Sequence, residues 1–132
     1  MEQSLVLIKP DGVKRNILGK IISVYEDHGL TIVNIKTQEP NRKKAEAHYQ
    51  EHVEKPFYPS LLASILEGSM VAMIVQGEDC VAKIRELNGA TDPSKAAPDT
   101  VRGRYGLSLQ ENTVHGSDSL ASAEREIKIW FD

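Results

Sequence analysis

Two short, unbroken apolar runs, Leu5-Val6-Leu7-Ile8 and residues 70–75, constrain the fold of this chain more than any other feature. Successive side chains of a strand point to opposite faces of its sheet, so such runs are typical of strands buried in the centre of a sheet. The β-branched residues 31–35 predict a further strand, and Thr113-Val114 predicts a short fourth one. None of these runs approaches the roughly 20 apolar residues that a membrane-spanning helix requires.

The segments between the strands predict helices and connections. Apolar residues recur at helical spacing in residues 17–25, 61–66, 81–87 and 120–130, and the polar residues 42–53 are compatible with a helix. Pro10-Asp11-Gly12 predicts a turn, and residues 90–105, rich in proline, predict a long irregular loop of the kind that is often functional.

This order of elements favours an α+β fold in a single domain that spans residues 1–132. We expect a ferredoxin-like βαββαβ arrangement, in which a four-stranded antiparallel sheet is covered by helices on one face. The long loop is the expected place for a ligand.

Composition limits the compartment and the partners. The net charge of -3 gives no general attraction for nucleic acid, so we expect no dedicated nucleic-acid site. A polyphosphate ligand would therefore need a local cluster of cations. The single cysteine, Cys80, excludes an internal disulfide and fits a reducing compartment, and no signal peptide or membrane span is recognisable, so we expect a cytoplasmic protein.

The segment Asn112-Thr113-Val114-His115-Gly116-Ser117-Asp118 carries the strongest chemical signal. Imidazole can act as a neutral nucleophile near pH 7, because its unperturbed pKa is about 6.5. Ser119, Ser122 and Glu126 follow at offsets that place them on one helix face, where a carboxylate could orient the imidazole. If His115 faces a pocket, the sequence predicts a covalent histidine intermediate.

Two other patterns give competing hypotheses. Residues 48–52 match the H-x-x-E-H spacing of some zinc proteases, which would make the chain a zinc hydrolase. Residues 103–106 match the G-x-x-G loop of KH domains, which would make it a non-catalytic nucleic-acid-binding module. A third pattern, residues 12–20, lacks the spacing and the hydroxyl residue of a phosphate-binding loop and is rejected.

Further motifs accompany the His115 segment in a fixed order: residues 7–13 (LIKPDGV), 55–58 (KPFY), 88–93 (NGATDP) and 101–103 (VRG). Together they closely resemble the nucleoside diphosphate kinase family over essentially the whole chain. The resemblance implies transfer of the γ-phosphoryl group from a nucleoside triphosphate to a nucleoside diphosphate, with low base specificity. It implies a ping-pong mechanism through a phosphohistidine and a Mg²⁺ ion that is bound through nucleotide phosphates rather than directly by the protein.

The same resemblance implies a role for each matching residue. His115 would be the nucleophile through the ring nitrogen nearer the backbone, with Glu126 and Ser117 orienting it and Tyr49 lining the same pocket. The phosphate contacts would come from Lys9, Arg85, Thr91 and Arg102, the sugar contacts from Asn112 and Lys9, and the base slot from Phe57, Leu61 and Leu109.

The resemblance also implies partners and one departure. ATP and other nucleoside di- and triphosphates would be the ligands, and the chain would form a homo-oligomer, with a hexamer favoured over a tetramer. Arg104 stands where the family usually has an acidic or other residue. It either adds a cation near the phosphate entrance or pairs with an acid such as Asp99.

Overall fold

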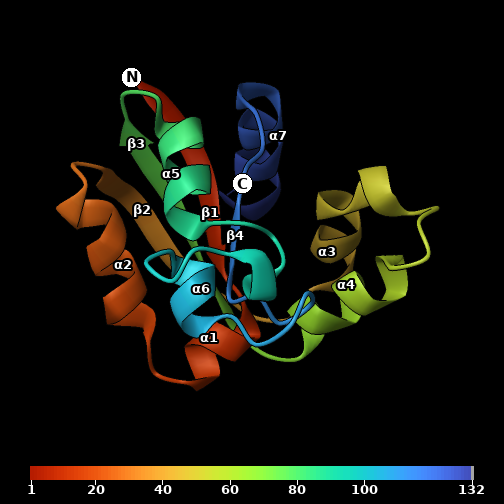
Figure 1. The fold of residues 1–132 in the computed structure, drawn as a ribbon. Helices are drawn as coiled ribbons and strands as arrows, with labels where there is room; N and C mark the ends of the chain where they lie inside the picture. The colour runs from red at the N-terminus through yellow and green to blue at the C-terminus, as the bar shows by residue number, and fades with distance from the viewer. Residues whose placement is uncertain (132) are drawn as a thin grey trace.

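The computed structural model describes residues 1–131 and places four strands in one sheet, with helices around it (Figure 1). The strands are β1 (Glu2–Ile8), β2 (Thr31–Gln38), β3 (Met70–Gly77) and β4 (Val114–Gly116). The helices are α1 (Pro10–Lys14), α2 (Leu18–Asp27), α3 (Arg42–His48), α4 (Tyr58–Leu66), α5 (Cys80–Asn88), α6 (Val101–Tyr105) and α7 (Leu120–Phe131), with single 3-10 turns at Gln50–His52 and Pro93–Lys95.

The sheet has the strand order β2-β3-β1-β4, and every neighbouring pair is antiparallel. This order and the sequence of elements along the chain confirm the expected ferredoxin-like α+β fold. The two unbroken apolar runs form β1 and β3, which occupy the centre of the sheet. No helix within residues 1–131 combines the length and the apolar character needed to cross a membrane.

Helices cover both faces of the sheet, so the expectation of helices on one face was wrong. Val6 and Ile8 pack into one core with residues of α2 and α5, whereas Leu5 and Leu7 pack into a second core with residues of α3, α4 and α7. Figure 1 shows α2 and α5 in front of the sheet and α7 behind it. Consecutive apolar residues on an alternating strand require this arrangement, because each face must be buried.

Two segments expected to be irregular are partly helical. Pro10 opens α1 instead of a simple turn, and proline at the first position with Asp11 in the first turn is favourable for a helix start. The expected loop of residues 90–105 contains the 3-10 turn at Pro93–Lys95 and the helix α6. The Thr100 side chain caps α6 by accepting a hydrogen bond from the Gly103 amide.

The polar segment expected to be one helix over residues 42–53 ends its α-helical part at His48. A single 3-10 turn, Gln50–His52, follows before α4 begins. His48 and Tyr49 lie at this break, where Tyr49 packs in the second core with Leu5 and Leu7. Both side chains are buried.

The ends of β1 and β4 meet where the site forms. His115 pairs with Leu7 in the ladder, and the backbone amide of Lys9 donates to the Thr113 carbonyl over 2.8 Å. Thr113 has a φ of +75°, which is unusual for a β-branched residue and is typical of backbone held in place by its surroundings. Its hydroxyl donates to the buried Asp11 carboxylate over 2.9 Å, so this conformation is anchored to α1.

Candidate active site

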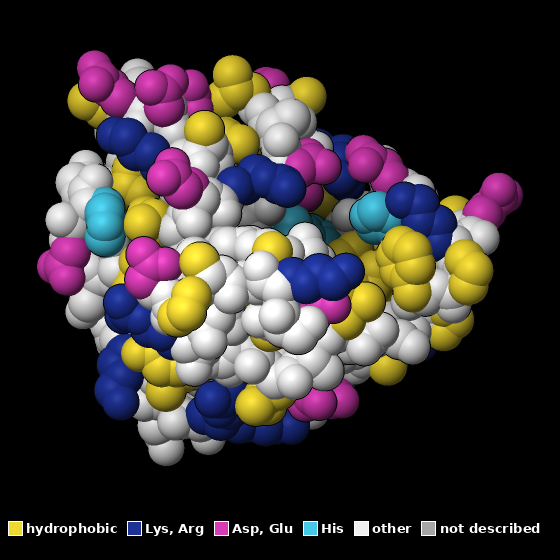
Figure 2. Space-filling model, in the orientation of Figure 1, with side chains coloured by type: hydrophobic (Ala, Val, Ile, Leu, Met, Phe, Trp, Pro, Cys, Tyr) yellow, Lys and Arg dark blue, Asp and Glu magenta, His cyan; other side chains and the backbone are white. Residues whose placement is uncertain are grey.

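A cavity of about 390 Å³ opens beside the ends of β1 and β4, between the α3–α4 pair and the rest of the molecule. Figure 2 shows it as a hollow with histidine side chains at its floor and Lys or Arg side chains near its rim. Of the site residues that the sequence indicated, all except Ser117 line this cavity: Lys9, Tyr49, Phe57, Leu61, Arg85, Thr91, Arg102, Leu109, Asn112, His115 and Glu126. The volume suits a small-molecule ligand.

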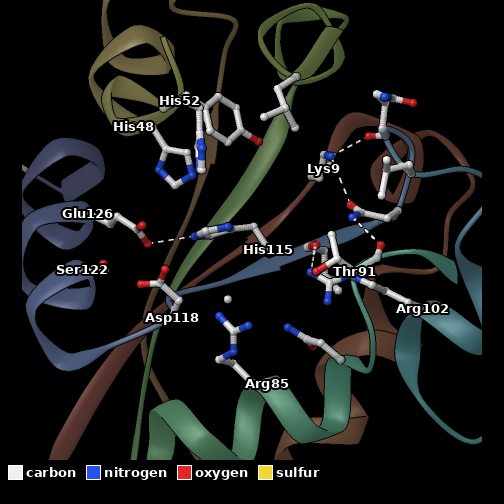
Figure 3. A pocket seen from close by; sticks show the side chains of 18 of the residues that line it. Lys9, His48, His52, Arg85, Thr91, Arg102, His115, Asp118, Ser122 and Glu126 are labelled. Carbon is white, nitrogen blue, oxygen red and sulfur yellow. Dashed lines mark hydrogen bonds and ion pairs between the residues drawn. The ribbon is translucent and has the colours of Figure 1, made fainter. Parts of the chain in front are cut away.

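His115 is held by a carboxylate on α7. Its Nε2 lies 2.8 Å from Oε1 of Glu126 (Figure 3). The Ser117 hydroxyl donates to the same oxygen over 2.8 Å. Burial opposes ionisation of Glu126, but the hydrogen bond and charge of His115 outweigh it and hold the pKa of this carboxyl below its ordinary value. An ionised carboxylate only accepts hydrogen bonds, so in the neutral imidazole the single proton lies on Nε2 and Nδ1 keeps its lone pair.

Ser117 lies behind the cavity wall and is fully buried. Its oxygen accepts a hydrogen bond from the Leu5 amide over 3.2 Å while its hydroxyl hydrogen goes to Glu126. Ser117 therefore fixes the Glu126 carboxylate to the backbone of β1. It contacts the imidazole only through that carboxylate.

Lys9 and Asn112 form a hydrogen-bonded pair on the opposite side of the cavity. The Lys9 ammonium donates to the Gln110 carbonyl over 2.6 Å and to Oδ1 of Asn112 over 3.1 Å. The Asn112 amide nitrogen donates in turn to the Thr91 carbonyl over 3.0 Å. Burial lowers the pKa of Lys9 to about 8, although the neighbouring Asp11 carboxylate raises it.

Arg102 joins three parts of the chain. Its guanidinium donates to the Gly89 carbonyl over 2.7 Å and to the Val114 carbonyl over 2.9 Å. Burial lowers its pKa, and the positive charge of Arg85 lowers it further. Figure 3 shows Arg85 approaching the same cavity from α5. Lys9, Arg85 and Arg102 thus supply the local cation cluster that a polyphosphate ligand requires in an acidic protein.

The outer part of the cavity is apolar. Phe57 and Leu109 are 42% and 47% exposed, and Leu61 lies between exposed and buried. These side chains leave an aromatic face and aliphatic edges open to a flat ligand. Tyr49 lies deeper and is buried, and burial raises the pKa of its phenol, which therefore stays protonated at neutral pH.

Three residues of types that bind metals meet at the floor of the cavity, yet their hydrogen bonds do not suit a metal. Ligand atoms of His48, His115 and Glu126 lie within 4.8 Å of one another. The Trp130 indole donates to Nδ1 of His48 over 3.2 Å, so the neutral His48 ring carries its proton on Nε2. A metal at Nε2 would move that proton to Nδ1, opposite another donor.

The zinc-protease hypothesis also fails on secondary structure. His48 ends α3, whereas His52 belongs to the following 3-10 turn, so the two do not share a helix face. Burial lowers the pKa of His48 well below its ordinary value, as does the charge of His115. His48 is a neutral, hydrogen-bonded residue of the cavity wall.

The nucleic-acid hypothesis for residues 103–106 fails for a packing reason. Gly103 lies inside α6, not in a loop between helices, and a Cβ there would lie only 2.0 Å from the Ala97 carbonyl oxygen. The glycine permits close packing. Arg104 is exposed and does not line the cavity, and it forms no ion pair with any residue in 1–131, so neither role considered for it is supported.

Several cavity residues were not assigned to this site from the sequence, among them His48, His52, Asn88, Asp118, Ser122 and Arg125. Asp118 is the last residue of the His115 segment, and Ser122 follows it on the helix face of Glu126, so their position in the sequence was the available signal. The Ser122 hydroxyl is the main cause of a lowered pKa for the Asp118 carboxyl. The other residues reach the cavity only through the packing of α3, α5, α7 and the 3-10 turn at Gln50–His52, which no local pattern reveals.

Comparison with known families shows to which family the chain belongs. A family model described as "Nucleoside diphosphate kinase" matches residues 2–132. The chain belongs to the nucleoside diphosphate kinase family. The nucleoside diphosphate kinase of Thermobifida fusca is 56% identical over 131 residues, which are 99% of this chain and 97% of that protein. The nucleoside diphosphate kinase of Clostridium perfringens is 53% identical over 131 residues, 99% of this chain and 92% of its own length.

Solved structures of nucleoside diphosphate kinases have the same fold. That of Halobacterium salinarum in complex with CDP matches with a TM-score of 0.96 and 42% identity, covering 99% of this chain and 88% of the other. The apo enzyme of Encephalitozoon cuniculi matches with a TM-score of 0.97 and 38% identity, covering 99% and 89%. This nucleoside diphosphate kinase family member is therefore a phosphotransferase that acts on nucleotides, and the family works with a divalent cation.

Proposed function

We propose that His115 carries the γ-phosphoryl group from a nucleoside triphosphate to a nucleoside diphosphate in two steps. In the first, the Nδ1 lone pair forms a bond to the γ-phosphorus while the bond to the β-phosphate oxygen breaks, and the diphosphate leaves. In the second, an oxygen of another diphosphate attacks the phosphohistidine and Nδ1 leaves. The observation that carries this proposal is the 2.8 Å contact between His115 Nε2 and Glu126, which leaves Nδ1 as the nucleophilic nitrogen.

Charged side chains provide most of what phosphoryl transfer needs, because the reaction depends on positioning and on stabilising negative charge. Lys9, Arg85, Arg102 and Thr91 are the proposed phosphate contacts, and Asn112 and Lys9 the proposed sugar contacts. Tyr49 lines the inner wall as a neutral phenol. Mg²⁺ would be held by phosphate oxygens of the nucleotide, since this ion prefers oxygen ligands and the nitrogen-containing cluster at His48 is already hydrogen-bonded. When bound, Mg²⁺ neutralises phosphate charge.

The apolar residues proposed to contact the base support low base specificity. Phe57 would stack on the base, with Leu61 and Leu109 at its edges, and none of these side chains can form hydrogen bonds with a base. Stacking is tolerant of base identity because every base has a π-face. ATP and the other nucleoside di- and triphosphates are therefore proposed as substrates of one site.

Phosphoryl labelling tests this function. The protein is incubated with γ-labelled ATP and Mg²⁺ without an acceptor, and an acid-labile, base-stable phosphoprotein should form and then discharge onto GDP or CDP. His115→Ala should take no label, whereas His28→Ala, at an exposed histidine after α2, should match the wild type. An unlabelled wild type, or a fully labelled His115→Ala, would overturn the proposal.

We also propose that residues 1–132 act as one domain within a homo-oligomer, with a hexamer favoured over a tetramer. The edge strand β2 supports association, because Val33 and Ile35 are 44% and 47% exposed and one edge of this strand has no neighbour within residues 1–131. Sedimentation of the wild type and of Ile35→Lys tests this: dissociation of the variant is expected, and a monomeric wild type would refute it. The free Cys80 supports a cytoplasmic enzyme, and the acidic net charge supports the lack of a nucleic-acid role.

A further inference from the structure

Arg125 lines the cavity but has no part in the function proposed above. It lies on α7 directly before Glu126, and its side chain is 27% exposed. Its guanidinium contacts the end of α3 on one side and the Glu126 carboxylate on the other. Both contacts affect the position of His115.

The first contact joins α7 to α3. The guanidinium Nη1 donates to the Ala47 carbonyl over 3.0 Å. Ala47 lies in the last turn of α3, where the helix dipole is negative, and its carbonyl is also approached by the Tyr49 amide. The next two residues, His48 and Tyr49, line the cavity. Arg125 therefore fixes the end of α3 that carries this part of the wall.

A second bond between the same helices lies further along α7. The Trp130 indole donates to Nδ1 of His48, and the His48 and His115 rings meet edge to face with centroids 4.4 Å apart. Figure 3 shows His48 approaching His115 from α3 while Glu126 reaches it from α7. The orientation of His115 thus depends on how α3 and α7 are held together.

The second contact concerns the carboxylate itself. Oε1 of Glu126 accepts the hydrogen bonds of both His115 and Ser117, whereas Oε2 accepts none from residues 1–131. The guanidinium Nη2 of Arg125 lies 3.8 Å from Oε2 and 3.7 Å from Oε1 of Glu51. The Arg125 charge therefore faces the carboxylate oxygen that the histidine does not use.

We propose that Arg125 is a positioning residue for the transfer step, in which its guanidinium bridges the end of α3 and the Glu126 carboxylate and so holds the His115 imidazole in its reactive orientation. The inference rests on the proposed role of His115 as nucleophile. Arg125 acts through Glu126 and the α3 wall, with its donors directed to Ala47 and the two glutamates. Its loss should therefore slow phosphoryl transfer without weakening nucleotide binding.

The test separates transfer from binding in Arg125→Gln and Arg125→Lys. Single-turnover formation of phosphohistidine is measured at saturating ATP and Mg²⁺, and ADP affinity is measured by calorimetry. Arg125→Gln should slow labelling by about 10-fold or more, as small misplacements of reacting groups do, with ADP affinity unchanged. Arg125→Lys keeps the charge but not the two-sided bridge, so its rate should lie between those of Arg125→Gln and the wild type.

Lys128→Gln is the matched control, since Lys128 is an exposed cation on the same helix and should label at the wild-type rate. Wild-type labelling by Arg125→Gln would overturn the inference, and so would a defect explained by weaker ADP binding, which would indicate a direct phosphate contact. Thermal melting shows whether Arg125→Gln folds. If it does not, a wild-type rate of phosphohistidine formation in Arg125→Lys would refute the positioning role of the guanidinium. An unlabelled wild type would instead refute the proposed function.

Discussion

His115 and Glu126 are joined by a contact of 2.8 Å between Nε2 and Oε1, and this contact determines which ring nitrogen can react. The carboxylate is ionised and nearly buried, so the proton must lie on the imidazole side of the contact. The two residues come from different elements, β4 and α7, and the serine that fixes the carboxylate comes from between them.

Glu126→Gln should slow phosphohistidine formation by about 10²- to 10⁴-fold. The glutamine side chain keeps the shape, but its amide nitrogen can donate to Nε2 and so stabilise the tautomer with a protonated Nδ1. The KM for ATP should stay close to that of the wild type, because Glu126 is not a proposed phosphate contact. Single-turnover labelling measures the rate, and Glu124→Gln, at an exposed position of the same helix, is the control. An equal rate in Glu126→Gln and Glu124→Gln would contradict the expected tautomer control.

Lys9 should give the enzyme a basic limb in its pH profile. Its pKa is about 8, so the ammonium is charged below that pH and increasingly neutral above it. We expect kcat/KM of the wild type to fall as the pH rises through 8, because the free enzyme loses a phosphate-binding charge. The kcat at saturating nucleotide should be less affected, since bound phosphate favours the charged lysine.

Lys9→Arg tests the assignment, because a guanidinium stays protonated throughout this range. The basic limb near pH 8 should disappear in Lys9→Arg, whatever the absolute rate, and should remain in Lys20→Arg, which changes an exposed lysine on α2. If the limb persists unchanged in Lys9→Arg, another group causes it.

The fold could be predicted where the pattern was local and dense. The run Leu5-Val6-Leu7-Ile8 predicted the central strand, and the order of elements predicted the ferredoxin-like sheet. Helices on both faces follow from the same run, since Leu5 and Val6 point to opposite sides, yet the sequence-based expectation placed them on one face. The helix α6 could not be predicted from its sequence, because Gly103 lowers helix propensity and the gain comes from packing against Ala97 and from the Thr100 cap.

The residues of the site could likewise be predicted only where they lie close together in the sequence. Glu126 follows His115 closely in the sequence, on one predicted helix face with Ser119 and Ser122, and this spacing suggested a carboxylate that orients the imidazole. The role of Ser117 came only from the family resemblance. Arg125 could not be singled out, because its partner Ala47 is 78 positions away and the contact exists only when α3 packs on α7. Local spacing can suggest groups that share an element, but it cannot show which surfaces of two distant helices meet.

Phe57→Ala should weaken the binding of every nucleotide to a similar extent. Loss of a stacking contact costs about 1–3 kcal/mol per base, so KM should rise by roughly 5- to 150-fold while kcat changes little. Initial rates with ATP, GTP and CTP measure this, and Val53→Ala removes an exposed apolar side chain outside the cavity as a control. A change confined to one nucleotide would indicate that the base is recognised by hydrogen bonds instead of by stacking.

Gly116→Ala should destabilise the protein and disturb the adjacent His115. A Cβ at this position would lie 2.8 Å from Cγ2 of Ile84 and 3.0 Å from Nδ2 of Asn88, both buried residues of α5. Forcing an extra carbon into such packing costs about 1–3 kcal/mol, and β4 would have to move away from α5 to admit it. Gly19→Ala is the matched control, because no atom lies within 4 Å of its Cβ position on α2 and alanine favours a helix by up to about 1 kcal/mol. Thermal unfolding should therefore shift down in Gly116→Ala and slightly up in Gly19→Ala, and phosphohistidine formation should slow only in the former. A Gly116→Ala protein with wild-type stability and labelling would show that the contact between α5 and β4 yields without moving His115.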